Sequence, residues 1–173
     1  MCGSVPPIDK AEEPARQAFM PTVQTSLFGP LDYEPSQLIS LAVPLPGLPD
    51  TKLLLPVSQS VLEPFVFFQS IDHPHLCLLA APVRVVKRDY QVGISGEERE
   101  LLRLTPGVEP GAGQETGVFA FVNAAGDGGA SANLLAPLVI HFGENLALQS
   151  IQSLDETFLR YPVPVCVSGG GSC

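Results

Sequence analysis

The chain has 173 residues, of which 45% are hydrophobic and 16% charged, and this composition excludes a disordered chain and suits one globular domain. Its 18 acidic residues outnumber 9 basic ones, which gives a formal net charge of −9. Because neutralising phosphates requires a concentrated Lys and Arg surface, this balance argues against direct nucleic-acid binding and favours a basic protein partner.

The longest apolar runs, residues 76–83 and 134–140, are far shorter than the roughly 18 residues that cross a bilayer. The N-terminus has early Pro and acidic residues where a secretory signal has basic residues and then an apolar run. We therefore expect a cytoplasmic protein that does not enter a membrane. No CxxC pair occurs among the cysteines, which is typical of free thiols in a reducing compartment, and a Cys166–Cys173 bridge is left open as an alternative.

Residues 1–22 mix Pro, Ala and charge without a sustained period, and we expect a flexible N-terminal extension there. Short apolar segments punctuated by Gly and Pro follow, at residues 22–28, 37–43, 52–57, 65–69, 76–80, 84–92, 117–122, 131–142 and 147–150. Such segments are typical of short strands. The 18 prolines would interrupt most helices but are tolerated in turns and at sheet edges. The sequence therefore predicts an all-β sandwich or barrel.

The segment at residues 65–69 is apolar on both sides. On a strand, Phe65 and Phe67 share one face, and Val66 and Phe68 share the other. This pattern predicts a central strand buried on both faces. The alternative is that one of the two faces is open to a partner.

The next segment contains three side chains that can bind zinc. A period of two would place His73, His75 and Cys77 on one face of a strand. A zinc-binding module or enzyme built on them is the alternative function. Pro74 and the unusual spacing favour a different interpretation, in which the histidines lie in a surface turn and Cys77 begins a strand.

Two short helices are predicted. Residues 95–104 begin with Ser95, followed three residues later by Glu98, which is a capping box. A shorter turn is expected at residues 153–159. The Gly-rich loop at residues 123–131 indicates a hairpin with an Asp127-Gly128 turn. Neither it nor the loop at 105–117 has a P-loop ending, no GxSxG is present, and we expect no enzyme. Residues 163–173 are expected to form a flexible Gly-rich C-terminal tail.

Two blocks carry a family resemblance: residues 64–82, PFVFFQSIDHPHLCLLAAP, and residues 131–140, SANLLAPLVI. Both resemble the flagellar assembly factor FliW family. Supporting matches are the turn Pro46-Gly47-Leu48-Pro49, and Tyr90 followed by an acidic helix at residues 97–104. The similarity covers roughly residues 23–162, which we take as one FliW-like β domain.

The resemblance implies a single-domain, antiparallel β-barrel-like fold with one or two short helices, no enzymatic activity and no cofactor. Proteins of this family bind the translational regulator CsrA and prevent it from repressing flagellin mRNA, and they are also bound by flagellin. The resemblance therefore implies an antirepressor that couples flagellin synthesis to flagellar assembly. It does not specify the oligomeric state.

Polar residues beside the matching motifs are the predicted partner contacts. They lie at a strand end, on the acidic helix and beside the hairpin: Gln69, Ser70, Asp72, Glu97, Glu98, Glu100 and Asn133. Acidic and polar groups suit a basic partner. The alternative is that Gln69 and Asn133 satisfy backbone groups where strands end, and that the glutamates form an ordinary solvated helix face.

Overall fold

A computed structural model describes residues 20–111, 113–124 and 129–163. Residues 1–19 of the expected N-terminal extension and 164–173 of the expected C-terminal tail lie outside the described residues. The expected turn at Asp127 and Gly128 also lies outside them.

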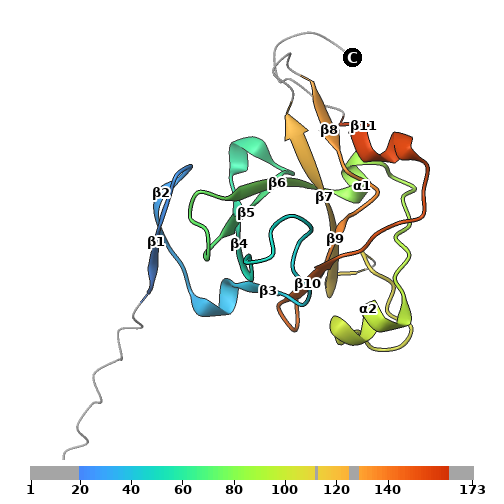
Figure 1. Cartoon of the computed structure of the whole chain (residues 1–173), viewed down its shortest axis with the longest axis horizontal. Coiled ribbons are helices and arrows are strands. Elements are labelled where there is room, and N and C mark those ends of the chain that lie inside the picture. Colours follow the sequence, from blue (N-terminus) through green and yellow to red (C-terminus); the bar gives the residue numbers. More distant parts are fainter. Residues whose placement is uncertain (1–19, 112, 125–128, 164–173) are drawn as a thin grey trace, which may run out of the picture.

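A closed barrel of seven strands organises the chain (Figure 1). Its strands are, in chain order, β3 (Ile39–Leu41), β4 (Leu53–Ser58), β5 (Val66–Ser70), β6 (Cys77–Pro82), β7 (Thr116–Ala124), β9 (Leu138–His141) and β10 (Leu146–Gln149). Neighbours are antiparallel except β3 and β10, which are parallel. Strand direction cannot alternate all the way around a ring with an odd number of strands, so one parallel pair is required. The all-β barrel predicted from the resemblance is confirmed.

Smaller elements surround the barrel. Strands β1 (Thr22–Thr25) and β2 (Gly29–Asp32) form a separate hairpin, and β8 (Ala130–Ala132) and β11 (Tyr161–Pro162) extend the sheet from β7. The helices are α1 (Val83–Val86), α2 (Gly96–Leu101) and three 3-10 turns, η1 (Pro35–Gln37), η2 (Ser60–Leu62) and η3 (Glu156–Arg160). In the described part of the chain no helix is long and apolar enough to span a membrane.

Two of the predicted strands differ from the structure. The strand expected at residues 84–92 is wrong: α1 begins at Val83 instead, and its single turn brings the buried Val83 and Val86 to one side. The run at 131–142 is divided into β8 and β9, and Pro137, which has no N–H to donate to a sheet, lies in the connection. The turn expected at 153–159 is the 3-10 turn η3, and the hairpin at 123–131 is confirmed by the pairing of β7 with β8.

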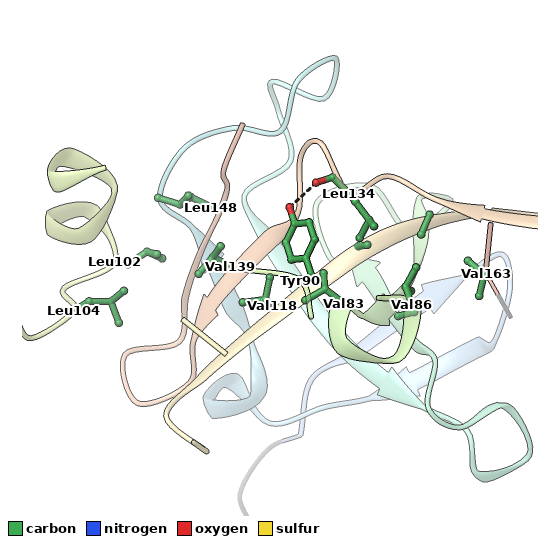
Figure 2. Packing of buried hydrophobic residues seen from close by; sticks show 13 residues of the cluster. Val83, Val86, Tyr90, Leu102, Leu104, Val118, Leu134, Val139, Leu148 and Val163 are labelled. Atoms are coloured by element: carbon green, nitrogen blue, oxygen red, sulfur yellow. Dashed lines mark hydrogen bonds between the residues drawn. The ribbon is translucent and has the colours of Figure 1, made fainter. Parts of the chain in front are cut away.

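The barrel wall is apolar on both faces. Alternate residues of β9 illustrate this, because Leu138 and Ile140 belong to the cluster inside the barrel and Val139 belongs to a second cluster outside it. The outer cluster joins strands β6, β7, β9 and β10 to α1, to the end of α2 and to Leu134 (Figure 2). All four residues of β9 are buried as a result.

Tyr90 is the polar anchor of the outer cluster. Its side chain is 6% exposed, and its hydroxyl donates a hydrogen bond to the carbonyl oxygen of Leu134 at 2.5 Å (Figure 2). Burial raises the pKa of Tyr90 to about 12, because the phenolate would lose its solvation. The neutral hydroxyl therefore ties the loop after α1 to the loop after β8.

Replacing Tyr90 with Phe removes this bond and leaves the Leu134 carbonyl buried without a donor. We expect Tyr90→Phe to lower the free energy of unfolding by about 1–3 kcal/mol at neutral pH. Urea denaturation followed by circular dichroism measures this change. An unchanged midpoint would mean that the bond contributes nothing to stability.

The effect of Tyr90→Phe on the free energy of unfolding should also depend on pH. In the unfolded chain Tyr90 ionises near its ordinary pKa of 10, whereas the folded chain keeps the proton up to about pH 12. The unfolded state therefore binds fewer protons in this window, and wild-type stability falls as the pH rises from about 10 to 12. Tyr90→Phe lacks this component, so the stability difference between the two proteins should narrow in the same window.

Candidate protein-binding surface

The turn between β5 and β6 depends on Gln69. Its side chain is fully buried, at 0% exposure, and Nε2 lies 2.9 Å, 3.1 Å and 3.0 Å from the carbonyl oxygens of Ser70, Pro74 and Leu76. Ser70 is also 0% exposed, and its hydroxyl accepts the His73 N–H at 3.0 Å. Both side chains hold the turn from within and are covered by protein in this structure.

Asp72 is exposed but its carboxylate is engaged by the backbone. One oxygen, Oδ2, accepts the N–H groups of Lys52 and Leu53, each at 2.8 Å. These donors begin β4, so Asp72 fixes the start of that strand against the turn. Its second oxygen has no hydrogen-bond partner among the described residues.

The zinc ligands considered from the sequence do not share a strand face. His73 and His75 lie in the turn, with ring centroids 6.2 Å apart, and Cys77 begins β6. Burial raises the pKa of the Cys77 thiol, which disfavours the thiolate that binds zinc. Among the described residues no group of three or more His, Cys, Asp or Glu side chains is placed to hold a metal ion.

Helix α2 begins as the sequence predicts. The Ser95 hydroxyl accepts the Glu98 N–H at 3.2 Å, and the Glu98 carboxylate accepts the Ser95 N–H at 2.6 Å, which completes the capping box. Glu98 is therefore occupied by the helix itself. The side chains of Glu97 and Glu100 are exposed and make no hydrogen bond or ion pair within the described chain, so they are available to a partner.

Three further glutamates surround α2 that sequence reasoning did not single out. Arg99, in the last turn of α2, lies 3.7 Å from Glu109, and Arg103, just after the helix, lies 2.9 Å from Glu144. His141, on β9, lies 3.2 Å from Glu115. Glu109 and Glu115 lie in the loop between α2 and β7, Glu144 lies between β9 and β10, and no local sequence pattern places them beside α2. The region around α2 therefore carries six carboxylates, which we call the α2 acidic surface: Glu97, Glu98, Glu100, Glu109, Glu115 and Glu144.

Leu102, at the end of α2, attaches the α2 acidic surface to the core. Leu102 is 0% exposed within the outer cluster, and its carbonyl oxygen lies 2.9 Å from Nδ1 of the buried His141 on β9. A rigid, net negative surface raises the rate of encounter with a basic protein and restricts how that protein docks.

Asn133 lies apart from this surface, after β8. Its Oδ1 accepts the Leu135 N–H at 3.0 Å, which is a local turn bond. Its side chain is half-buried and lines a hollow between β6 and β7. The structure thus brings the helix glutamates together but not Asn133, Gln69 or Ser70 with them.

Comparison with known proteins gives a consistent result. The family model described as FliW protein matches residues 22–163. The flagellar assembly factor FliW of Carboxydothermus hydrogenoformans is 32% identical over 142 residues, which cover 80% of this chain and 86% of the relative. That of Clostridium acetobutylicum is 25% identical, over 82% of this chain and 96% of the relative.

A solved structure shares the fold. The crystal structure of a flagellar assembly factor FliW superimposes with a TM-score of 0.72 at 19% sequence identity, and the match covers 83% of this chain and 96% of that one. At this identity the likeness concerns the barrel architecture.

The contacts of Gln69 predict that this side chain stabilises the fold. Gln69→Met keeps the length of the side chain but removes the donor to three carbonyl groups, and it also removes the buried Oε1, which has no partner in the described chain. We expect the free energy of unfolding to fall by about 1–3 kcal/mol. Thermal and urea denaturation measure it. Unchanged stability would contradict the structural role.

Proposed function

The chain belongs to the FliW family, and from this premise we propose that it is a protein-binding antirepressor that captures CsrA and is itself bound by flagellin. While flagellin is abundant in the cell, it occupies this protein and leaves CsrA free to repress flagellin mRNA. Export of flagellin then releases the protein, which captures CsrA, and flagellin synthesis resumes.

The family match over residues 22–163 carries the proposal, and the α2 acidic surface supports a site for it. Glu97 and Glu100 are exposed there without a protein partner, and Arg99 and Arg103 are already engaged by Glu109 and Glu144. The surface therefore offers unneutralised carboxylates to a basic RNA-binding protein.

The proposal includes a cytoplasmic protein that acts by binding rather than by catalysis and that contacts neither nucleic acid nor a membrane. The excess of acidic residues, 18 against 9 basic ones, opposes phosphate binding. The raised pKa of the Cys77 thiol makes it a poor nucleophile at neutral pH.

Titration calorimetry of the full chain against CsrA from the same organism tests the proposal, with a parallel titration against flagellin and a metal assay of the sample. We expect saturable binding to each protein without stoichiometric metal. If neither CsrA nor flagellin binds, the proposed function is wrong. Stoichiometric zinc in protein purified without added metal would favour the alternative built on His73, His75 and Cys77.

The double variant Glu97→Lys/Glu100→Lys tests the α2 acidic surface. It reverses two exposed charges and leaves the Ser95 and Glu98 cap intact. Because like charges across an interface slow the encounter, we expect the association rate with CsrA to fall about tenfold at low salt. Stopped-flow or surface-based kinetics measure this rate.

A matched control is Asp50→Lys/Glu156→Lys, which makes the same change in net charge at two exposed residues on other elements. We expect it to reduce the rate much less. Equal reductions by the two double variants would show that net charge alone governs the encounter, and the α2 acidic surface would then lose its role.

A further inference from the structure

Strands β6 and β7 separate at one end of their ladder. They pair only through Ala80 with Phe121, Ala81 with Ala120, and Pro82 with Phe119. Continued in the same register, residues 77–79 would face residues 122–124, but these pairs do not form, although the structure describes all six residues. There β7 pairs with β8 on its other edge, and Figure 1 shows this arm rising above the barrel. We call the opening the β6–β7 notch.

Among the described residues, no strand pairs with the edges of β6 and β7 that face this notch. Residues 77–79 of β6 pair with β5 on their far edge only, and residues 122–124 of β7 pair with β8 on theirs. An unpaired edge presents backbone N–H and C=O groups to any extended segment that lies beside it. The first chemical requirement of an occupant is therefore an extended backbone.

Two hollows of different chemistry border the notch. One, of about 170 Å³, is lined by residues that are all apolar within the described chain, including Phe67, Leu79, Val122 and Ala124. The other, of about 270 Å³, adds the polar side chains of Asn123, Ser131 and Asn133. Both are bordered by Leu79 and Val122, the residues that would face each other next in the interrupted ladder.

This arrangement specifies the side chains of an occupant. Successive residues of a strand point to opposite faces, so an added strand directs alternate side chains into the two hollows. None of the described residues that line the two hollows is charged, and a buried charge would lack a partner among them. Apolar side chains fit beside Phe67 and Leu79, and small uncharged polar side chains fit beside Asn123 and Ser131.

The rims of the notch also expose apolar groups. Val61 is 85% exposed and precedes Leu62, which lines the apolar hollow and is 42% exposed. Leu159, on the side of the other hollow, is 48% exposed. Large exposed apolar side chains beside an apolar hollow are typical of protein interaction sites.

We propose that the β6–β7 notch binds an extended, uncharged segment of a protein partner, which pairs with the free edge of β6 and alternates apolar with small polar residues. The inference rests on the proposed function in so far as the occupant is a partner protein. It assigns a second surface, built from strand edges and apolar hollows, that shares no residue with the α2 acidic surface.

The chain's own C-terminal end is the competing occupant. The Val163 N–H donates to the carbonyl oxygen of Ala130 at 3.0 Å, and Ala130 lines the apolar hollow. Residues 164–173 follow directly. A chain that ends after Val163 therefore belongs in the test.

The probe is an acetylated and amidated peptide with the uncharged core Thr-Val-Ser-Val-Thr-Val-Ser and one Lys at each end for solubility, titrated into the isotope-labelled full chain. Amide chemical shifts should move at residues 77–79 and 122–124, and hydrogen exchange should slow along β6. The matched control peptide carries N-methyl groups on all seven central residues, so neither of its edges can donate hydrogen bonds to a strand, and it should bind at least about tenfold more weakly. Shifts located elsewhere, no shifts at all, or equal binding of both peptides would overturn the proposal.

Ala124→Lys provides the corresponding variant. Ala124 is exposed at the end of β7 and borders the apolar hollow, so a Lys there obstructs the hollow with a charge without replacing a core residue. We expect about tenfold or greater loss of peptide affinity. Gln91→Lys, at an exposed residue that borders neither hollow, should bind as the wild type does. Equal affinity of the two variants counts against the notch.

The outcomes separate this proposal from the proposed function. Peptide binding that occurs only in the chain ending after Val163 would identify the chain's own end as the occupant and overturn a partner segment. If calorimetry shows CsrA binding but the peptide does not bind, the proposed antirepressor function is supported and the proposed peptide site at the β6–β7 notch is wrong. If the peptide binds but neither CsrA nor flagellin does, the site at the notch is supported and the proposed antirepressor function is wrong.

Discussion

A barrel wall that is apolar on both faces determines where the surrounding elements must pack. In β9 and β10 the interior cluster takes Leu138, Ile140 and Ala147, and the outer cluster takes Val139 and Leu148. Closing the barrel buries only the first set, so α1, the end of α2 and the segment around Leu134 must cover the second. Burial of a Leu or Val side chain stabilises the fold by about 1.5–3 kcal/mol, so this outer covering is as necessary as the barrel itself. The position of α2, and with it the α2 acidic surface, follows from that requirement.

In the two sequence blocks that resemble the family, the polar side chains mainly stabilise turns and strand ends of this fold. Gln69 binds three carbonyl groups of a turn, Asp72 accepts backbone N–H groups where β4 begins, and Asn133 closes the turn after β8. A motif of this kind identifies the barrel reliably, because replacing any of these groups leaves buried or strand-end backbone atoms without partners. It locates the partner surface poorly. The exposed carboxylates that suit a basic partner lie on α2 and on loops outside both matching blocks, where sequence can change at little cost to folding.

The parts of the fold that sequence predicts are those set by local chemistry. The capping box of Ser95 and Glu98 and the apolar run at residues 65–69 each require only neighbouring residues to agree. The error at residues 84–92 has the same origin: β-branched Val83, Val85 and Val86 favour a strand locally, but the outer cluster accepts Val83 and Val86 from one helical turn. Glu109, Glu115 and Glu144 join α2 only through tertiary contacts, and the β6–β7 notch arises from where a ladder stops. Neither has a local pattern from which it can be predicted.

Charge and strand edges contribute differently to binding, and the structure separates them. Carboxylates on an exposed helix act over a Debye length of about 8 Å at physiological salt, so in the proposed complex the α2 acidic surface affects mainly how fast the basic partner arrives. A strand edge beside an apolar hollow acts only at contact, and backbone pairing with buried side chains affects mainly how long a partner stays. Because α2 and the notch are attached to the same rigid wall, through Leu102 on one side and through Ala80 and Ala81 of β6 on the other, their geometry relative to each other is fixed. A single partner that uses both surfaces must span that fixed separation, and two partners that use one each need not exclude each other by direct overlap.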